Sequence, residues 1–149
     1  MSEDGSELDV QLDDDGVSLS ALVAETWIWR NEKMGNIAPD EWVLLFDDCV
    51  WLLGDDGLHA TIPSWPLTLY RCGHPEGMSW AMNIESALHF QKMRPHEPVW
   101  KCSVADCSDL LAIFHSRNES EAVLRSDGAW RASVEQIVSL VCHAEALDA

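Results

Sequence analysis

Four side chains in this 149-residue chain have the types and the order needed to act on a dinucleotide. Arg71 ends one alternating segment, Ser79 begins the next, and Glu119 and Glu121 form a Glu-x-Glu pair. A guanidinium offers bidentate donors to phosphate oxygens, and a carboxylate stabilises positive charge near an anomeric carbon. These groups could therefore hold nicotinamide dinucleotide and break its glycosidic bond.

Each of these residues also has an ordinary structural interpretation. Arginine at a strand end is commonly a surface or salt-bridge residue, and Ser79 could be a turn residue. On a strand, Glu119 and Glu121 share a face, and a solvated face is the commoner explanation for such a pair. Their occurrence together, in this order, adds weight to the functional interpretation.

The spacing of apolar residues predicts the elements that position these groups. A first helix is expected from Ser18 or Ser20 to a C-cap at Gly35. Pro39, at a first helical position, opens a second helix that is expected to close at Gly54.

Short strands interrupted by one helix are predicted after these helices. Asn83 is the expected N-cap of that helix, and further helices are expected from Ser108 through Phe114 and from a capping box at Ser133 and Gln136. Strands are predicted over residues 67–71, 79–82, 99–104 and 121–124. This order predicts an α+β fold, with N-terminal helices followed by a mixed or antiparallel sheet.

Length and composition predict one domain with an acidic tail. A chain of 149 residues with 47% hydrophobic residues is long enough for one core and too short for two ordinary domains. Residues 1–17 are polar and acidic, so they bury too little apolar surface to offset their ordering entropy. We expect a flexible tail there and a single α+β domain over residues 18–149.

The net charge of −17 lies mainly in the N-terminal half. Residues 1–70 hold fifteen acidic and two basic residues, a net charge of −13. Such a field repels nucleic acid and membranes and attracts basic surfaces, so we expect a cationic protein face as any macromolecular partner. Solubility alone is the other interpretation of this charge.

Cysteine usage and the N-terminus indicate the compartment. Five irregularly spaced cysteines without a CxxC motif favour buried thiols in a reducing compartment over disulfides, and they predict no metal site. The acidic N-terminus and the absence of an apolar run of 18 residues predict a soluble intracellular protein.

The site segments resemble small phage and prophage proteins with an ADP-ribosyltransferase-like fold. In that pattern a strand ends in Tyr-Arg-Gly, a Gly-Met-Ser-Trp-Thr segment follows, and an Arg-x-Glu-x-Glu strand closes the site. The matching segments here are Leu69-Tyr70-Arg71, Gly77-Met78-Ser79-Trp80 and Arg117-Asn118-Glu119-Ser120-Glu121. Cys72 and Ala81 depart from the pattern, which has Gly and Thr at these positions.

The resemblance implies an enzyme that uses NAD as its substrate. Arg71 would hold the phosphates, Ser79 and Trp80 would line the nicotinamide pocket, Glu121 would be the catalytic carboxylate and Glu119 would orient the attacking group. It also implies a phage-encoded protein that modifies or binds a host protein in the bacterial cytoplasm.

Two other functions remain open. A non-catalytic acidic inhibitor, an anti-defence nucleic-acid mimic such as an anti-CRISPR or anti-restriction protein, would occupy a basic surface through the carboxylates of residues 1–56. An immunity or antitoxin protein that masks a basic toxin would use the same charge, so the sequence does not separate the two.

Overall fold

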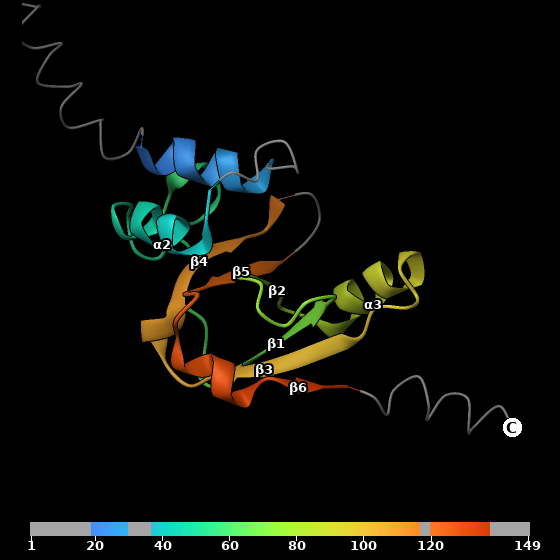
Figure 1. Ribbon diagram of the computed structural model, residues 1–149. Coiled ribbons are helices and arrows are strands. Elements are labelled where there is room, and N and C mark those ends of the chain that lie inside the picture. Colours follow the sequence, from blue (N-terminus) through green and yellow to red (C-terminus); the bar gives the residue numbers. More distant parts are fainter. Residues whose placement is uncertain (1–18, 30–36, 117–119, 138–149) are drawn as a thin grey trace, which may run out of the picture. The chain divides into compact units, whose positions relative to one another are not determined.

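The structure, a computed structural model, describes residues 19–29, 37–116 and 120–137 (Figure 1). These residues form two compact units, one made of residues 19–29, 37–62 and 111–116 and the other of residues 63–110 and 120–137. The expected tail over residues 1–17 lies outside the described residues. The single domain over residues 18–149 stays a prediction.

The first unit is built around a cluster of aromatic rings. Trp27 meets Trp42 edge-on, with ring centroids 4.9 Å apart, and its ring lies 5.3 Å from that of Phe46. Such edge-to-face pairs stabilise a core beyond their buried area. The described elements of this unit are a helix over residues 19–28, α2 (Pro39–Asp47), the 3-10 helix η2 (Asp55–Gly57) and residues 111–114 of strand β4 (Leu110–Phe114).

Helix α2 begins at Pro39 as predicted, but the expected end at Gly54 is wrong, because the helix stops at Asp47. An acidic residue at this end is unfavourable to the helix dipole. Further along, the Leu53 N–H donates to the carbonyl of Leu111 at 3.3 Å, and the Ile113 N–H donates to the carbonyl of Leu53 at 2.9 Å. Pairing with β4 therefore replaces helical hydrogen bonding at Leu53.

Ser20 does not cap the first helix. It lies within the helix over residues 19–28 and is buried, and its Oγ accepts a hydrogen bond from the Val50 N–H at 3.2 Å. The hydroxyl thus ties this helix to the segment after α2. The other expected caps, Ser18 and Gly35, lie outside the described residues.

The second unit is an antiparallel sheet with a helix packed against it (Figure 1). Its strands follow the order β5-β2-β1-β3-β6. The elements are β1 (Leu67–Cys72), β2 (Ser79–Ala81), α3 (Ile84–Met93), β3 (Val99–Val104), the 3-10 helix η3 (Cys107–Asp109), β5 (Glu121–Leu124), the 3-10 helix η5 (Ala129–Ser133) and β6 (Glu135–Gln136). The predicted α+β class with an antiparallel sheet is confirmed.

The core of the second unit follows the predicted alternation. Cys102 and Val104 of β3 are buried, whereas Ser103 between them is exposed. Trp80 and Trp130 meet edge-on with centroids 5.4 Å apart, and both are buried. The N-cap of α3 is also confirmed, since Asn83 Oδ1 accepts from the Ser86 N–H at 2.9 Å.

The helix expected over residues 108–114 is wrong. A short 3-10 turn ends at Asp109, and its cap is Asp106, whose Oδ1 accepts from the Ser108 N–H at 2.8 Å. The five residues of β4 that follow are all buried. A short run that is apolar throughout has no alternation, so its pattern alone does not separate a buried strand from a helix.

The expected start of a final helix at Ser133 is also wrong. Residues 129–133 form the 3-10 helix η5, and Glu135 and Gln136 pair with β3 as strand β6. The Ser133 hydroxyl accepts from the Ser103 N–H at 2.8 Å instead of capping a helix. Residues 138–149, which would carry the rest of that helix, lie outside the described residues. Within the described ranges, no helix is long and apolar enough to cross a membrane.

Candidate functional site

The strand register of the second unit brings together three of the predicted residues. Strand β2 pairs with β1 at Ala81 and Tyr70, and with β5 at Ala81 and Glu121. Arg71 directly follows Tyr70, and Ser79 is two residues before Ala81. Residues separated by up to fifty positions in the chain therefore meet across three neighbouring strands.

The central contact joins Ser79 to Glu121. The Ser79 hydroxyl donates a hydrogen bond to Oε2 of Glu121, and both residues are half-buried. Glu121 faces Ala81 across the ladder, and side chains two apart on a strand share a face, so the hydroxyl and the carboxylate project from the same face. This bond fixes the direction in which the carboxylate points.

The Arg71 side chain contacts Ser79 through the backbone carbonyl group of that residue. Its Nη1 donates to the carbonyl oxygen of Ser79 and its Nε donates to that of His74, each at 2.6 Å. The guanidinium thus joins the end of β1 to the loop over residues 73–78 and to the first residue of β2. The predicted contact with phosphates stays a prediction.

Gly77 allows the guanidinium to lie in this loop. A Cβ atom at Gly77 would be 2.2 Å from Cζ of Arg71 and 2.3 Å from its Nη2. Any other residue would therefore push the guanidinium away. Sequence reasoning did not assign Gly77 to the site, although a glycine two residues before Ser79 was a usable signal.

Trp80 lies in the core of the second unit. It is 1% exposed, and its Nε1–H donates to the carbonyl of Gly77 at 2.8 Å. Because adjacent strand residues point to opposite faces, its ring projects away from the face that carries Ser79. The observed position is that of a core residue that anchors the loop, and its predicted part in a nicotinamide pocket stays a prediction.

The remaining predicted acid, Glu119, lies outside the described residues, so its expected role in orienting the attacking group stays a prediction.

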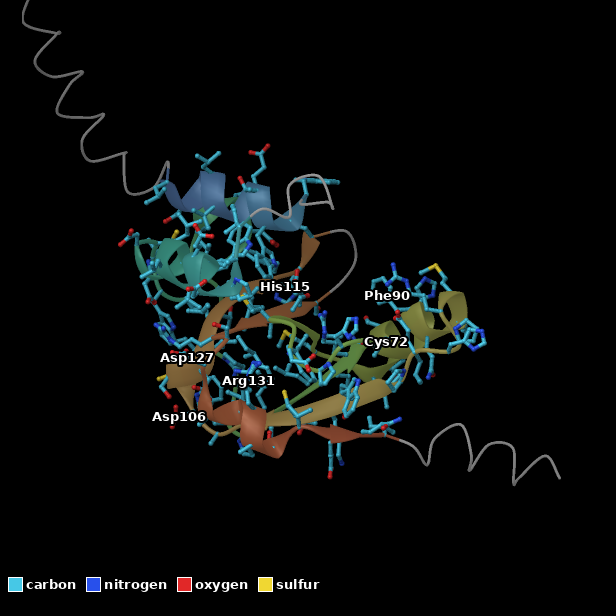
Figure 2. All side chains as sticks on the ribbon, in the orientation of Figure 1. Cys72, Phe90, Asp106, His115, Asp127 and Arg131 are labelled. Atoms are coloured by element: carbon cyan, nitrogen blue, oxygen red, sulfur yellow. The ribbon has the colours of Figure 1, made fainter. Side chains whose placement is uncertain are left out.

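Cys72, which is labelled in Figure 2, directly follows Arg71, and its thiol is not suited to act as a nucleophile. Burial raises the pKa of Cys72, and the nearby carboxylate of Glu97 raises it further. A thiol rather than a thiolate is therefore expected at neutral pH, and the thiolate is the reactive form. Among the residues that the structure describes, no group of three His, Cys, Asp or Glu side chains could hold a metal ion.

Comparisons with protein-family models, with curated proteins and with solved structures found no match to this chain. The hydrogen bonds that join Ser79 to Arg71 and to Glu121 are therefore the observations that point to a function.

Proposed function

We propose that this protein is an ADP-ribosyltransferase-like protein that uses NAD to modify a host protein in the bacterial cytoplasm. The observation that carries the proposal is the hydrogen bond from the Ser79 hydroxyl to the Glu121 carboxylate. A carboxylate held in one direction can stabilise positive charge that develops on a ribose ring. It does so without having to reorganise during the reaction.

In the proposed reaction, the bond between C1′ of the ribose and the nicotinamide nitrogen breaks. The electron pair leaves with the nitrogen, so the cationic ring becomes neutral nicotinamide. A nucleophile of the target protein, or water, forms the new bond to C1′ and releases its proton. Glu121 stabilises the oxocarbenium-like state, and Ser79 orients Glu121.

Arg71 fits this reaction in two ways. Its bond to the carbonyl of Ser79 positions the residue that orients Glu121. Its positive charge also lies close to the same strand end, where it favours the diphosphate of NAD. The second role requires a direct contact with substrate, whereas the first requires only the geometry described above.

The test is transfer of labelled ADP-ribose to proteins of a bacterial lysate, detected by mass spectrometry. Addition that is lost in Glu121→Gln supports the proposal. The matched control is Glu135→Gln, because Glu135 is an exposed acid on β6 of the same unit, paired with Lys101 at 3.0 Å. Equal labelling by wild type and Glu121→Gln would reject Glu121 as the catalytic residue.

A second candidate function is a non-catalytic inhibitor that occupies a basic protein surface. Helix α2 supports it, because its outward face carries exposed acidic side chains around Leu44, which is 66% exposed. These acids lie three or four residues from Leu44, so they surround it on the helix surface. They are Asp40, Glu41 and Asp47 of the helix and its C-cap, Asp48.

The two functions respond differently to salt and to substitution. Binding through this acidic face should weaken steeply between low and high salt and should survive Glu121→Gln. Co-precipitation with a purified basic partner over a salt series measures it. Salt-insensitive binding would exclude the inhibitor mechanism.

A further inference from the structure

Three segments of the first unit pair side by side as a small sheet, and the outermost segment has an open edge. Leu53 is the central residue, because it forms a parallel bridge with Ala112 of β4 and an antiparallel bridge with His59. Its N–H and C=O groups are both bonded to β4, at Leu111 and Ile113. The segment that contains His59 therefore forms the edge of this small sheet on the side away from β4.

The hydrogen bonds of this edge segment fix the direction in which its backbone groups point. The Gly54 N–H donates to the carbonyl of Leu58 at 2.6 Å, and the Ala60 N–H donates to the carbonyl of Leu52 at 2.9 Å. In an antiparallel ladder, the residue between two such bonds directs its own N–H and C=O to the opposite side. This residue is His59, which is exposed, and in the part of the chain that the structure describes no backbone group is hydrogen-bonded to it.

The turn that leads into this edge is held on two sides. Gly57 of the turn lies against the first helix, since a Cβ atom there would be 2.5 Å from the backbone nitrogen of Ala21. Asp55 of the same turn accepts hydrogen bonds from the His115 N–H at 3.1 Å and from the Ser116 hydroxyl at 2.9 Å. An edge that is already ordered loses less conformational entropy when a further strand pairs with it.

The charge of the first unit determines which kind of strand suits this edge. The described residues of this unit include seven acidic residues and no lysine or arginine. A second copy of the unit would bring the same carboxylates together, whereas a basic segment of another protein meets a complementary potential. The Leu58 side chain, which is 64% exposed, offers the incoming strand an apolar contact. The seven acids are Glu25, Asp40, Glu41, Asp47, Asp48, Asp55 and Asp56.

We propose that residues 58–60 bind an extended basic segment of a partner protein, which adds to this edge as a further strand. The backbone of the segment accepts a hydrogen bond from the His59 N–H and donates one to the His59 carbonyl. These main-chain bonds supply affinity, and lysine or arginine side chains of the segment supply the complementary charge. The inference goes beyond the proposed function, because it holds whether or not the second unit cleaves NAD.

The test uses a labelled peptide of about ten residues in which lysine and valine alternate, with binding measured by fluorescence anisotropy. His59→Pro removes the outward N–H and puts a ring in its place. The preceding residue, Leu58, has φ −89° and ψ 165°, close to the conformation that a residue before proline adopts. His59→Ala is the matched control, because it removes the same imidazole and keeps the N–H. We expect His59→Pro to raise Kd about tenfold or more and His59→Ala to stay within about twofold of wild type.

A second measurement locates the bound peptide. Hydrogen exchange of the His59 amide, followed by NMR, should slow when the peptide is added to the wild-type protein. If His59→Pro does not fold, as judged by circular dichroism, this exchange measurement decides the question.

Three results would overturn the inference. Equal Kd values in His59→Pro and His59→Ala, or unchanged exchange at saturating peptide, would show that the peptide binds elsewhere on the acidic surface. Absence of peptide binding at low salt would show that the edge does not take a basic strand. A wild-type dimer that His59→Pro converts to a monomer would show that a second copy occupies the edge. None of these results bears on the cleavage of NAD, so the proposed function is tested separately.

Discussion

Gly77→Ala should displace the Arg71 guanidinium without removing it. The added Cβ would start 2.2 Å from Cζ of Arg71, and ordinary contact begins at 3.4 Å, so the guanidinium must move by about 1.2 Å. A group that moves this far does not keep both of its 2.6 Å hydrogen bonds, to His74 and to Ser79. The guanidinium should therefore no longer link the end of β1 to the first residue of β2.

The expected cost follows from these two bonds. A hydrogen bond to a charged group contributes about 1.5–3 kcal/mol, and water compensates part of the loss because Arg71 is half-buried. We expect Gly77→Ala to lower the free energy of unfolding by about 1–3 kcal/mol. In an Arg71→Ala background the same substitution meets no guanidinium and should cost less than about 0.5 kcal/mol.

Urea unfolding of the four proteins of this double-mutant cycle, followed by tryptophan fluorescence, measures the difference. A cost that depends on the presence of Arg71 supports the observed packing. An equal cost in both backgrounds would refute it, because Gly77 would then be needed for the backbone of the loop and not for the guanidinium.

Three further predictions concern the second unit. Trp130→Ala should lower the free energy of unfolding by about 3–5 kcal/mol in urea titrations, because it empties a site in contact with Trp80. Asn83→Ala should cost about 1 kcal/mol in thermal unfolding, and Asn83→Asp much less, because aspartate can also cap α3. Burial raises the pKa of Cys102 to about 12, so a thiol reagent should label the exposed Cys107 first and Cys102 only after unfolding. In the unfolded chain the Cys102 thiol ionises near its ordinary pKa of about 8.5, whereas in the folded protein it stays protonated to about pH 12. The contribution of Cys102 to the free energy of unfolding is therefore complete below about pH 8.5 and should be lost as the pH rises towards about 12. Labelling of native Cys102 at the rate of Cys107, or Asn83→Asp as costly as Asn83→Ala, would contradict the respective prediction.

The strands of the second unit were predictable where alternation or local capping dominates. Strand β3 has the predicted bounds, Val99 to Val104, and exposed Ser103 lies between buried Cys102 and Val104 as expected, whereas Val99 is also buried and Trp100 is half-buried. Asn83 caps α3 through a hydrogen bond that spans three residues, so the signal is local. Features of this kind depend on neighbours in the sequence and can be read from it.

Other elements depend on partners far away in the chain. Leu53 leaves the helical pattern because it pairs with residues near 112, almost sixty positions later. Strand β4 is apolar at every position, so its pattern carries no period. The Ser133 hydroxyl, predicted as a cap, is engaged by Ser103. In each case a tertiary contact decides the conformation that local preference left open.

The candidate site shows the same division. The order of Arg71, Ser79 and Glu121 in the sequence predicted a common site, and the structure brings them together. The two carbonyl groups that accept from the guanidinium, and the close approach of Gly77 to it, depend on the path of the folded loop, so the sequence alone did not predict them.

The most direct test of the central claim is the rate at which purified protein releases nicotinamide from NAD, measured by chromatography. We predict release by the wild-type protein and by Glu135→Gln. Loss of the carboxylate in Glu121→Gln should reduce the rate by about a hundredfold or more, the scale seen when one charge-stabilising group is removed from an active site. Release that is unchanged in Glu121→Gln, or absent from the wild-type protein, would contradict the claim that Arg71, Ser79 and Glu121 form a site that cleaves NAD.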